Sequence, residues 1–223
     1  EGMTGGAKAW TLHLLVLLAV FAAQFVLPSY HETNLARIMV LAVFAMGYNI
    51  AFGYTGLLSL GHALFFAAGM YGMGLPVWHL EWLSVPALIA GLLAGGALAG
   101  AVGLLALRTA GVSFMIVTLM FAQAGYLALL YLNTWTGGDE GFVVARTGRG
   151  LFGFDLSTDT PRFTAAFVLF AAALLACLWL VRSPFGRVMV AMRENEERSR
   201  MLGFDPFRVK LIALVLSGLY AGV

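Results

Sequence analysis

Long apolar runs constrain this chain more than any other feature of its sequence. Uncharged stretches of near membrane-spanning length recur, and the acidic side chains fall between them rather than inside them. A helix needs about twenty apolar residues to cross a hydrocarbon core of about 30 Å, and a charge at the bilayer centre is costly. The strands of a membrane β-barrel would instead alternate in hydrophobicity. The pattern therefore predicts an all-α polytopic membrane protein.

The runs predict about six complete transmembrane helices and the start of another. Their approximate bounds are 10–29, 36–53, 57–78, 85–107, 112–132 and 163–181, with a last run from 209 to Val223. The first run is longer than the apolar region of a signal peptide, about 7–15 residues, so we expect it to be retained. The last run barely suffices to span a bilayer, which takes about twenty residues. We therefore expect residues 1–223 to be a fragment, forming a single transmembrane domain.

The distribution of Lys and Arg predicts a cytoplasmic N-terminus. With that end inside, the inner loops carry nine of the thirteen basic residues and the outer loops carry four. Positively charged loops are retained on the cytoplasmic side. Residues 133–162 are then an exterior loop, and residues 183–208 are a cytoplasmic loop.

Composition excludes several other classes of protein. The chain is 61% hydrophobic and 11% charged, whereas soluble domains have about 25% charged residues. A net charge of +2 gives no reason to expect nucleic-acid binding, and the single Cys177 excludes an intrachain disulfide among these residues. None of the four histidines lies three or four positions from another, so we expect no metal site.

Small residues recur at helical spacing in the run 85–107. Gly91, Gly95, Ala99 and Gly103 lie on one helix face, and Gly96 and Gly100 form a second row. Small residues allow two membrane helices to approach closely. We expect intrachain packing here, with a dimer contact as the alternative.

The stretch GYTGLLSLGHALFFAAGMYG, residues 53–72, combines an apolar span with unusual polarity. As a helix it would place Ser59 beside Thr55 and His62, with Asn49 nearby. Its glycines permit a break or a close helix crossing. Loosened helices that line a cavity are one route to a substrate site in transporters, and the alternative is a histidine packed between helices.

The loop that follows residue 182 predicts a charged helix on the cytoplasmic side. Ser183 can cap a helix that begins at Pro184, and we expect helical structure over Arg187–Leu202 that ends at Gly203. Such a helix is either a solvated loop or a docking element for a cytoplasmic partner.

Three motifs in order resemble one family. The stretch GLLSLGHALFFAAGMY, the exterior TGGDEG at 136–141, and RSPFGRVMVAMRENEERSRMLGFDPFRVKLIALVLSG are similar to the permease subunits of bacterial branched-chain amino acid importers. These importers belong to the ATP-binding-cassette class, and the M-type subunit is the closer resemblance. It covers most of the chain and is weakest over residues 1–35.

The resemblance implies a multi-pass protein of the bacterial plasma membrane, in contact with lipid and working with other chains. These are a second permease, two cytoplasmic ATPases and an extracytoplasmic substrate-binding protein. ATP is bound by the ATPases, so no cofactor is expected in this chain. The sequence agrees, because it contains no G-x-x-x-x-G-K-[ST] phosphate loop.

The resemblance also implies roles for three groups of residues. The substrate pathway is expected to include Asn49, Thr55, Ser59, His62, Thr118 and Gln123. Coupling to the ATPases is expected at Arg193, Glu194, Asn195, Glu196, Glu197 and Gly203. Contact with the binding protein is expected at Gly137, Gly138, Asp139 and Glu140, with an ordinary glycine-rich exposed turn as the alternative. Arg198 and Ser199 stand where the family often has two alanines, which makes the docking contact more polar.

Three alternatives stay open. A urea or short-chain amide permease of the same class shares the SLGH-type stretch and the charged loop. An ion-coupled secondary transporter would usually place an acid or base in the membrane, and His62 is the one candidate. An intramembrane enzyme is disfavoured, because no nucleophile–base pair or H-E-x-x-H motif is present.

Overall fold

The structure is a computed structural model that describes residues 2–26, 28–141, 150–151, 154–155 and 158–223. Helices dominate it, as the apolar runs predict. The long helices are α1 (Gly2–Ala23), α2 (Ser29–Asn49), α3 (Ala63–Leu80), α4 (Ser84–Ala106), α5 (Val112–Tyr131), α7 (Asp159–Arg182) and α10 (Pro206–Ala221). The shorter elements are the π-helix η1 (Ile50–Tyr54), α6 (Asn133–Thr136), α8 (Pro184–Glu194), α9 (Glu196–Met201), and the strands β1 (Gly150–Leu151) and β2 (Phe154–Asp155). The strands pair antiparallel.

Five described helices are long and apolar enough to cross a membrane, and Trp10–Ala23 is a shorter apolar helix. The chain is therefore an all-α polytopic membrane protein, as predicted, with its one two-stranded sheet outside the spans. The predicted bounds are shifted in places. The second span begins at Ser29 rather than 36, directly after Pro28 in extended conformation. The third begins at Ala63 rather than 57, because residues 56–62 are not helical.

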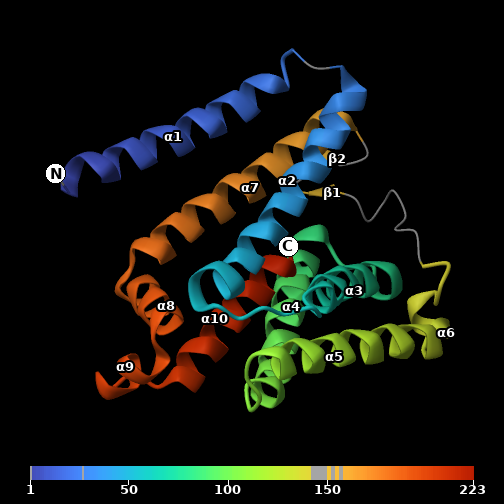
Figure 1. Ribbon diagram of the computed structural model, residues 1–223. Coiled ribbons are helices and arrows are strands. Elements are labelled where there is room, and N and C mark those ends of the chain that lie inside the picture. Colours follow the sequence, from blue (N-terminus) through green and yellow to red (C-terminus); the bar gives the residue numbers. More distant parts are fainter. Residues whose placement is uncertain (1, 27, 142–149, 152–153, 156–157) are drawn as a thin grey trace.

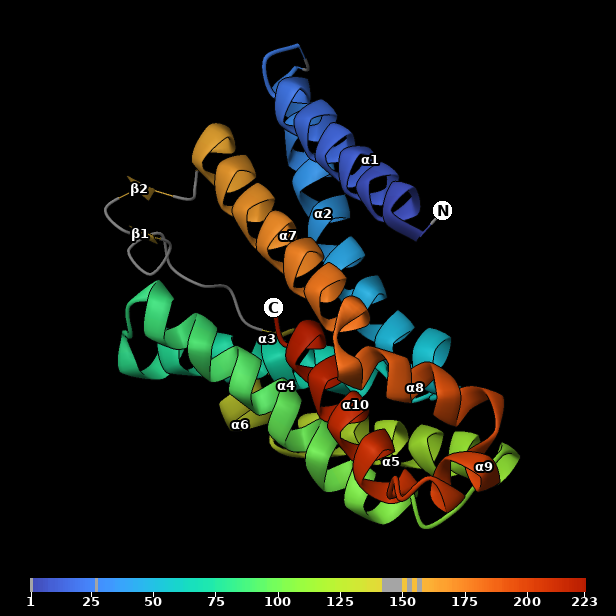
Figure 2. The same ribbon diagram turned by 90° about the vertical axis from the view of Figure 1, so that its left-hand side faces the viewer.

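The helices form two groups that meet at α10. In one group α4 packs against α3 and α10, and in the other α2 packs against α7. Helix α10 also contacts α2 and so joins the groups. Helix α1 lies at the edge of the bundle (Figure 1), where it contacts α7 and its Val20 packs against the buried cluster formed by α2 and α7. Figure 2 shows α2 and α7 side by side, with α8 continuing from α7 toward α9.

The small residues of α4 explain how closely it approaches α10. A Cβ on Gly95 would lie 2.5 Å from the Gly218 carbonyl oxygen, and one on Gly96 would lie 2.7 Å from Leu219 Cδ2. A Cβ on Gly91 would lie 2.9 Å from the Gly69 carbonyl oxygen on α3. The two rows of small residues are therefore packed within the chain, which confirms the first of the two predicted interpretations.

The connections between helices gather at two opposite ends. At one end, the segment after η1, the α4–α5 connection and the α9–α10 region surround a common cavity. At the other end, Thr33 Oγ1 donates to Asp159 Oδ1 at 3.0 Å, joining the starts of α2 and α7. His79 Nε2 also donates to the Trp135 carbonyl there at 3.1 Å. Which end faces the cytoplasm stays a prediction from the basic residues.

Candidate functional site

The helix that begins as α2 is broken where the polar stretch starts. It widens into η1, and residues 56–62 are then non-helical until α3 begins. Gly56 has φ +74°, and Leu57 N donates back to the Ala51 carbonyl at 2.9 Å. Thr55 Oγ1 donates to the same carbonyl at 2.5 Å. The prediction that Ser59 and His62 share one helix face is therefore wrong, because no helix runs through this segment.

His62 instead joins three elements at a buried point. Its Nε2 lies 3.0 Å from Ser217 Oγ on α10, and Ser217 Oγ lies 2.5 Å from the Gly47 carbonyl oxygen on α2. A carbonyl only accepts, so the Ser217 hydroxyl donates to Gly47. His62 Nε2 then donates to Ser217, which leaves Nδ1 as the unprotonated acceptor. Ser217 was missed in the sequence, where it is one serine in an otherwise apolar run.

Two buried polar atoms in this region have no hydrogen-bond partner among the described residues. They are Ser59 Oγ and His62 Nδ1. Both side chains are almost fully buried, at 2% and 3% exposed. Phe44, Tyr48 and Phe65 surround the imidazole with ring centroids 5.0–5.4 Å away. Buried polar groups are normally hydrogen-bonded, so these two atoms are exceptions to the usual pattern.

Thr118 ties α5 to the same segment. Its hydroxyl donates to the Met115 carbonyl at 2.9 Å and accepts from Leu60 N at 3.2 Å. A Cβ on Gly61 would collide with the Thr118 carbonyl oxygen. Ser59 and His62 therefore lie on the non-helical segment 56–62, and Thr118 of α5 is hydrogen-bonded to the same segment.

The other predicted pathway residues lie apart from the buried point. Thr55 is buried and bonded within its own turn, while Asn49 and Gln123 are exposed on the surfaces of α2 and α5. Asn49 Oδ1 lies against Gly53, where a Cβ would displace it. Their assignment to a pathway stays a prediction.

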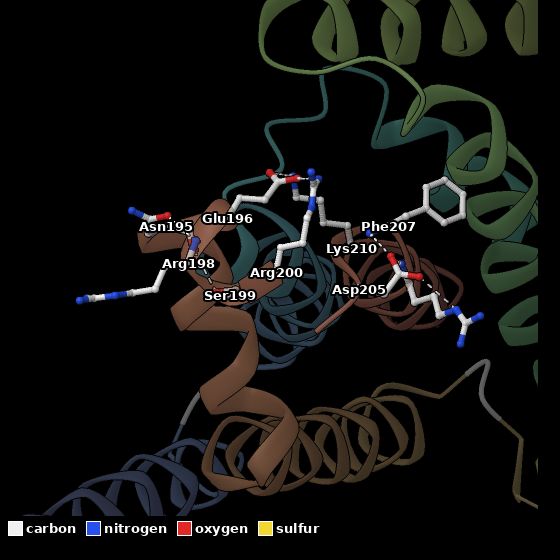
Figure 3. A network of polar contacts seen from close by, with 9 residues as sticks. Asn195, Glu196, Arg198, Ser199, Arg200, Asp205, Phe207 and Lys210 are labelled. Atoms are coloured by element: carbon white, nitrogen blue, oxygen red, sulfur yellow. Dashed lines mark hydrogen bonds and ion pairs between the residues drawn. The ribbon is translucent and has the colours of Figure 1, made fainter. Parts of the chain in front are cut away.

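The loop that the sequence predicts to be cytoplasmic forms two helices rather than one. Ser183 caps α8 by accepting from Gly186 N at 3.1 Å, and Gly203 ends α9 with φ +92°, close to where the sequence predicted a stop. Continuous helix over Arg187–Leu202 is wrong, because Asn195 is extended at φ −155°, ψ 103°. Its side chain caps α9 by accepting from Arg198 N at 2.8 Å (Figure 3).

Charged groups fix α9 to the start of α10. Glu196 Oε2 pairs with Lys210 Nζ at 2.5 Å, and Glu196 Oε1 lies 3.7 Å from Arg200. Asp205 caps α10 by accepting from Phe207 N at 3.0 Å, and the same carboxylate pairs with Arg208 at 3.1 Å. Figure 3 shows the side chains of Glu196, Arg200 and Lys210 converging. The pairs are partly exposed, so each contributes roughly 0–1 kcal/mol to stability. They act mainly to orient α9 against the start of α10.

Helix α8 has one face in the core and one in solvent. Met189 and Met192 are buried against Ile50, Val209 and Ala213. The opposite face and the α9 tip are exposed, including Arg193, Glu194 and Glu197. The tip also carries apolar side chains in solvent, with Met201 86% and Leu202 71% exposed. Sequence reasoning missed these two, although both directly precede Gly203.

Helices α8 and α9 together form a hairpin, residues 184–201. A cavity of about 700 Å³ lies between this α8–α9 hairpin and the membrane helices. Its walls include Thr55–Leu58 from the non-helical segment, residues 107–112 from the α4–α5 connection, and the Glu196–Lys210 pair. The cavity therefore lies between the α8–α9 hairpin with the start of α10 and the broken helix.

The glycine-rich motif that the sequence predicts to be exterior forms a tight turn after α6. Gly137, Gly138 and Gly141 have positive φ, and Gly138 N donates to Thr136 Oγ1 at 3.2 Å. Asp139 and Glu140 are exposed at its tip. Arg146 and Arg149 of the predicted exterior loop lie outside the described residues. Within the described part of the chain, no group of three or more His, Cys, Asp or Glu side chains is placed to hold a metal ion.

Comparison with known proteins identifies the family. The family described as "Branched-chain amino acid transport system / permease component" matches residues 30–223. The chain is 31% identical to the high-affinity branched-chain amino acid transport system permease protein LivM of Salmonella typhimurium and 32% identical to LivM of Escherichia coli. Each comparison covers 98% of this chain but 57% of the relative, so the chain spans little more than half their length.

No solved structure matches the chain significantly. The spans and the bacterial relatives place it in the bacterial plasma membrane as a multi-pass protein. The family match covers the polar stretch, the exterior turn and the cytoplasmic hairpin together. The chain belongs to the permease-component family of branched-chain amino acid transport systems.

Proposed function

We propose that this chain is part of the membrane permease subunit of an ATP-driven importer for branched-chain amino acids. It provides part of the translocation pathway and receives conformational work from separate ATPase subunits. The observation that carries the proposal is the α8–α9 hairpin. Its inner face is buried against η1 and α10, and its tip exposes charged and apolar side chains.

The hairpin suits docking to a cytoplasmic ATPase. Met201 and Leu202 are apolar anchors, and Glu194, Glu197 and Arg198 are exposed around them. Interfaces commonly combine apolar anchors with a charged rim that steers the partner. Because Met189 and Met192 bury the other face against α10 and η1, a force on the tip is transferred to the spans. ATP hydrolysis then takes place in the partner, and this chain needs no catalytic residue.

The broken helix suits a place on the translocation pathway. Non-helical backbone at membrane depth is tolerated where it is buried in protein or lines a cavity. Ser59 Oγ and His62 Nδ1 supply an O–H and an acceptor whose capacity no described protein group uses. They suit the polar end of an amino acid, or a water that relays to it, during passage. We further propose that the exterior turn with Asp139 and Glu140 contacts the extracytoplasmic binding protein, and that a second permease completes the pathway.

Uptake of radiolabelled leucine into proteoliposomes tests this function. The vesicles would contain the full-length protein with its companion permease, ATPases and binding protein, with and without ATP. We expect ATP-dependent uptake that isoleucine and valine compete. Uptake that follows a proton gradient without ATP would overturn the proposal. If leucine is not transported but urea or an amide with its matching binding protein stimulates ATP hydrolysis, the substrate class is wrong and the architecture stands.

Charge reversal on the hairpin tests coupling in the same vesicles. Glu197→Lys combined with Glu194→Lys, both exposed, should reduce uptake within the roughly 5–150-fold range of allosteric coupling, while membrane insertion is unchanged. Glu32→Lys, on α2 at the exterior end, is the control and should transport normally. Unchanged uptake in the double variant would show that the hairpin does not dock the ATPases.

A further inference from the structure

The side chain of Arg193 crosses from α8 to the end of η1. Its guanidinium donates a hydrogen bond to the Gly53 carbonyl, 140 positions earlier in the chain. Carbonyls in the last turn of a helix lack intrahelical donors, and the chain leaves helical geometry just beyond Gly53. A cationic donor makes such a bond stronger than a neutral one. Arg193 therefore caps a helix to which it is not joined in sequence.

The contact extends along the arginine side chain and the helix beneath it. A Cβ on Gly56 would lie 3.4 Å from Arg193 Cγ, so the arginine stem passes over the turn that ends η1. Below it, Ile50 is fully buried with Met189 and Met192, and Tyr54 packs against the same cluster. Helix α8 thus holds η1 in two ways: its buried methionines pack against Ile50, and Arg193 donates a hydrogen bond to the Gly53 carbonyl.

The segment that Arg193 caps ends at the buried polar point. Gly56 N donates to the Phe52 carbonyl at 3.0 Å, which keeps the turn compact. Further along, Leu60 N is bonded to Thr118 and His62 to Ser217. One short segment therefore links α8 at one end to α5 and α10 at the other.

The π-helix η1 has an α-helical hydrogen-bond register as its alternative. A π-turn holds one more residue than an α-turn, and such turns are frequent at functional sites. Loss of the hydrogen bond from Arg193 would favour α-helical backbone hydrogen bonds in η1. That change of register would rotate and shift the residues that follow η1. Packed elements respond to small shifts by such discrete changes.

We propose that Arg193 is the positioning residue that transmits movement of the α8–α9 hairpin to the segment 53–62, by capping η1 in its π-helical register. This inference rests on the proposed function, because it requires that partner ATPases move the hairpin. It assigns to Arg193 an inward contact with the pathway segment in place of an outward contact with the ATPase.

A fluorescent probe on the segment tests the proposal in the assembled full-length transporter. Cysteine is placed at Leu60, which is 50% exposed, in a background where Cys177 is alanine, and is labelled with an environment-sensitive bimane. Emission is compared with ATP and ADP in nanodiscs. We expect the bimane emission to shift between ATP and ADP when Arg193 is present. In Arg193→Gln this emission shift should be about fivefold smaller, which is the lower bound for a coupled site.

Two further variants separate the bond from the charge. Arg187→Gln removes the same charge from an exposed position on α8 and should leave the shift unchanged. Arg193→Lys retains a donor for the Gly53 carbonyl and should restore at least half of the shift. An equal loss in Arg187→Gln, or no rescue by lysine, would overturn the hydrogen-bonded cap.

The outcomes distinguish this inference from the proposed function. If the parent protein shows ATP-dependent uptake and Arg193→Gln keeps the full shift, the cap is wrong and the importer function stands. If the parent shows neither ATP-dependent uptake nor stimulated hydrolysis, the proposed function fails and this inference fails with it.

Discussion

Helices α4 and α5 are consecutive apolar spans of 23 and 20 residues, yet they play different parts in the fold. Among the residues that the structure describes, α4 buries nine and α5 buries two. The difference follows from glycine. Helix α4 has small residues on two rows that admit α3 and α10, while the surface of α5 carries large side chains such as Ile116 and Met120.

The comparison shows that hydropathy and packing are separate signals in a membrane chain. Lipid tails are as apolar as leucine, so an apolar surface does not by itself draw two helices together. Close approach of backbones does, and it requires small residues. Helix α5 is instead held near its start by Phe114 and Thr118, the two residues that it buries.

The largest effect should come from filling the α4–α10 contact. Gly95→Ala places a Cβ 2.5 Å from the Gly218 carbonyl oxygen, and backbone cannot move aside as a side chain can. We expect a loss of about 1–3 kcal/mol, as for overpacking in cores, measured by thermal unfolding in detergent with size-exclusion detection. Gly100→Ala is the matched control, because its nearest neighbour would be a Val215 methyl at 3.4 Å. Equal stability of the two variants would show that α4 and α10 are not in backbone contact.

Much of this packing could be predicted from the sequence, because it depends on local spacing. The spans follow from run length, the small-residue rows from a period of four, and the caps at Ser183 and Gly203 from residue type. The predicted sidedness follows from the basic residues in the cytoplasmic loop.

The candidate site could be predicted in composition but not in geometry. His62 and Ser59 stood out as polar residues in an apolar run, yet their helical arrangement was wrong because η1 and the break are fixed by tertiary contacts. The bond from Leu60 N to Thr118 and that from His62 to Ser217 join positions far apart in the chain. The Arg193 cap has no local signature, whereas Asn195 before two glutamates is a preferred N-cap that the prediction of one continuous helix overlooked.

A smaller effect should follow from loosening the anchor of α5. Thr118→Val keeps the side-chain shape but removes the acceptor for Leu60 N, at a net cost of about 0.5–1.5 kcal/mol. Hydrogen exchange at the Leu60 amide should accelerate by up to roughly tenfold, and mass spectrometry of the folded protein measures it. Thr118→Ser retains the hydroxyl and should exchange like the parent. Unchanged exchange in the valine variant would mean that another group protects this amide.

The smallest effect should come from the surface of α5. Met120 is 65% exposed, and in a bilayer that face meets lipid, whose contacts replace those of the lost side chain. Met120→Ala should therefore change the stability of the chain by no more than about 0.5 kcal/mol, in the same thermal assay as Gly95→Ala. A loss above about 1 kcal/mol would show that the exposed face of α5 is packed within the chain. The contrast between the two spans would then rest on how many neighbours each has, rather than on where glycine allows a neighbour to approach.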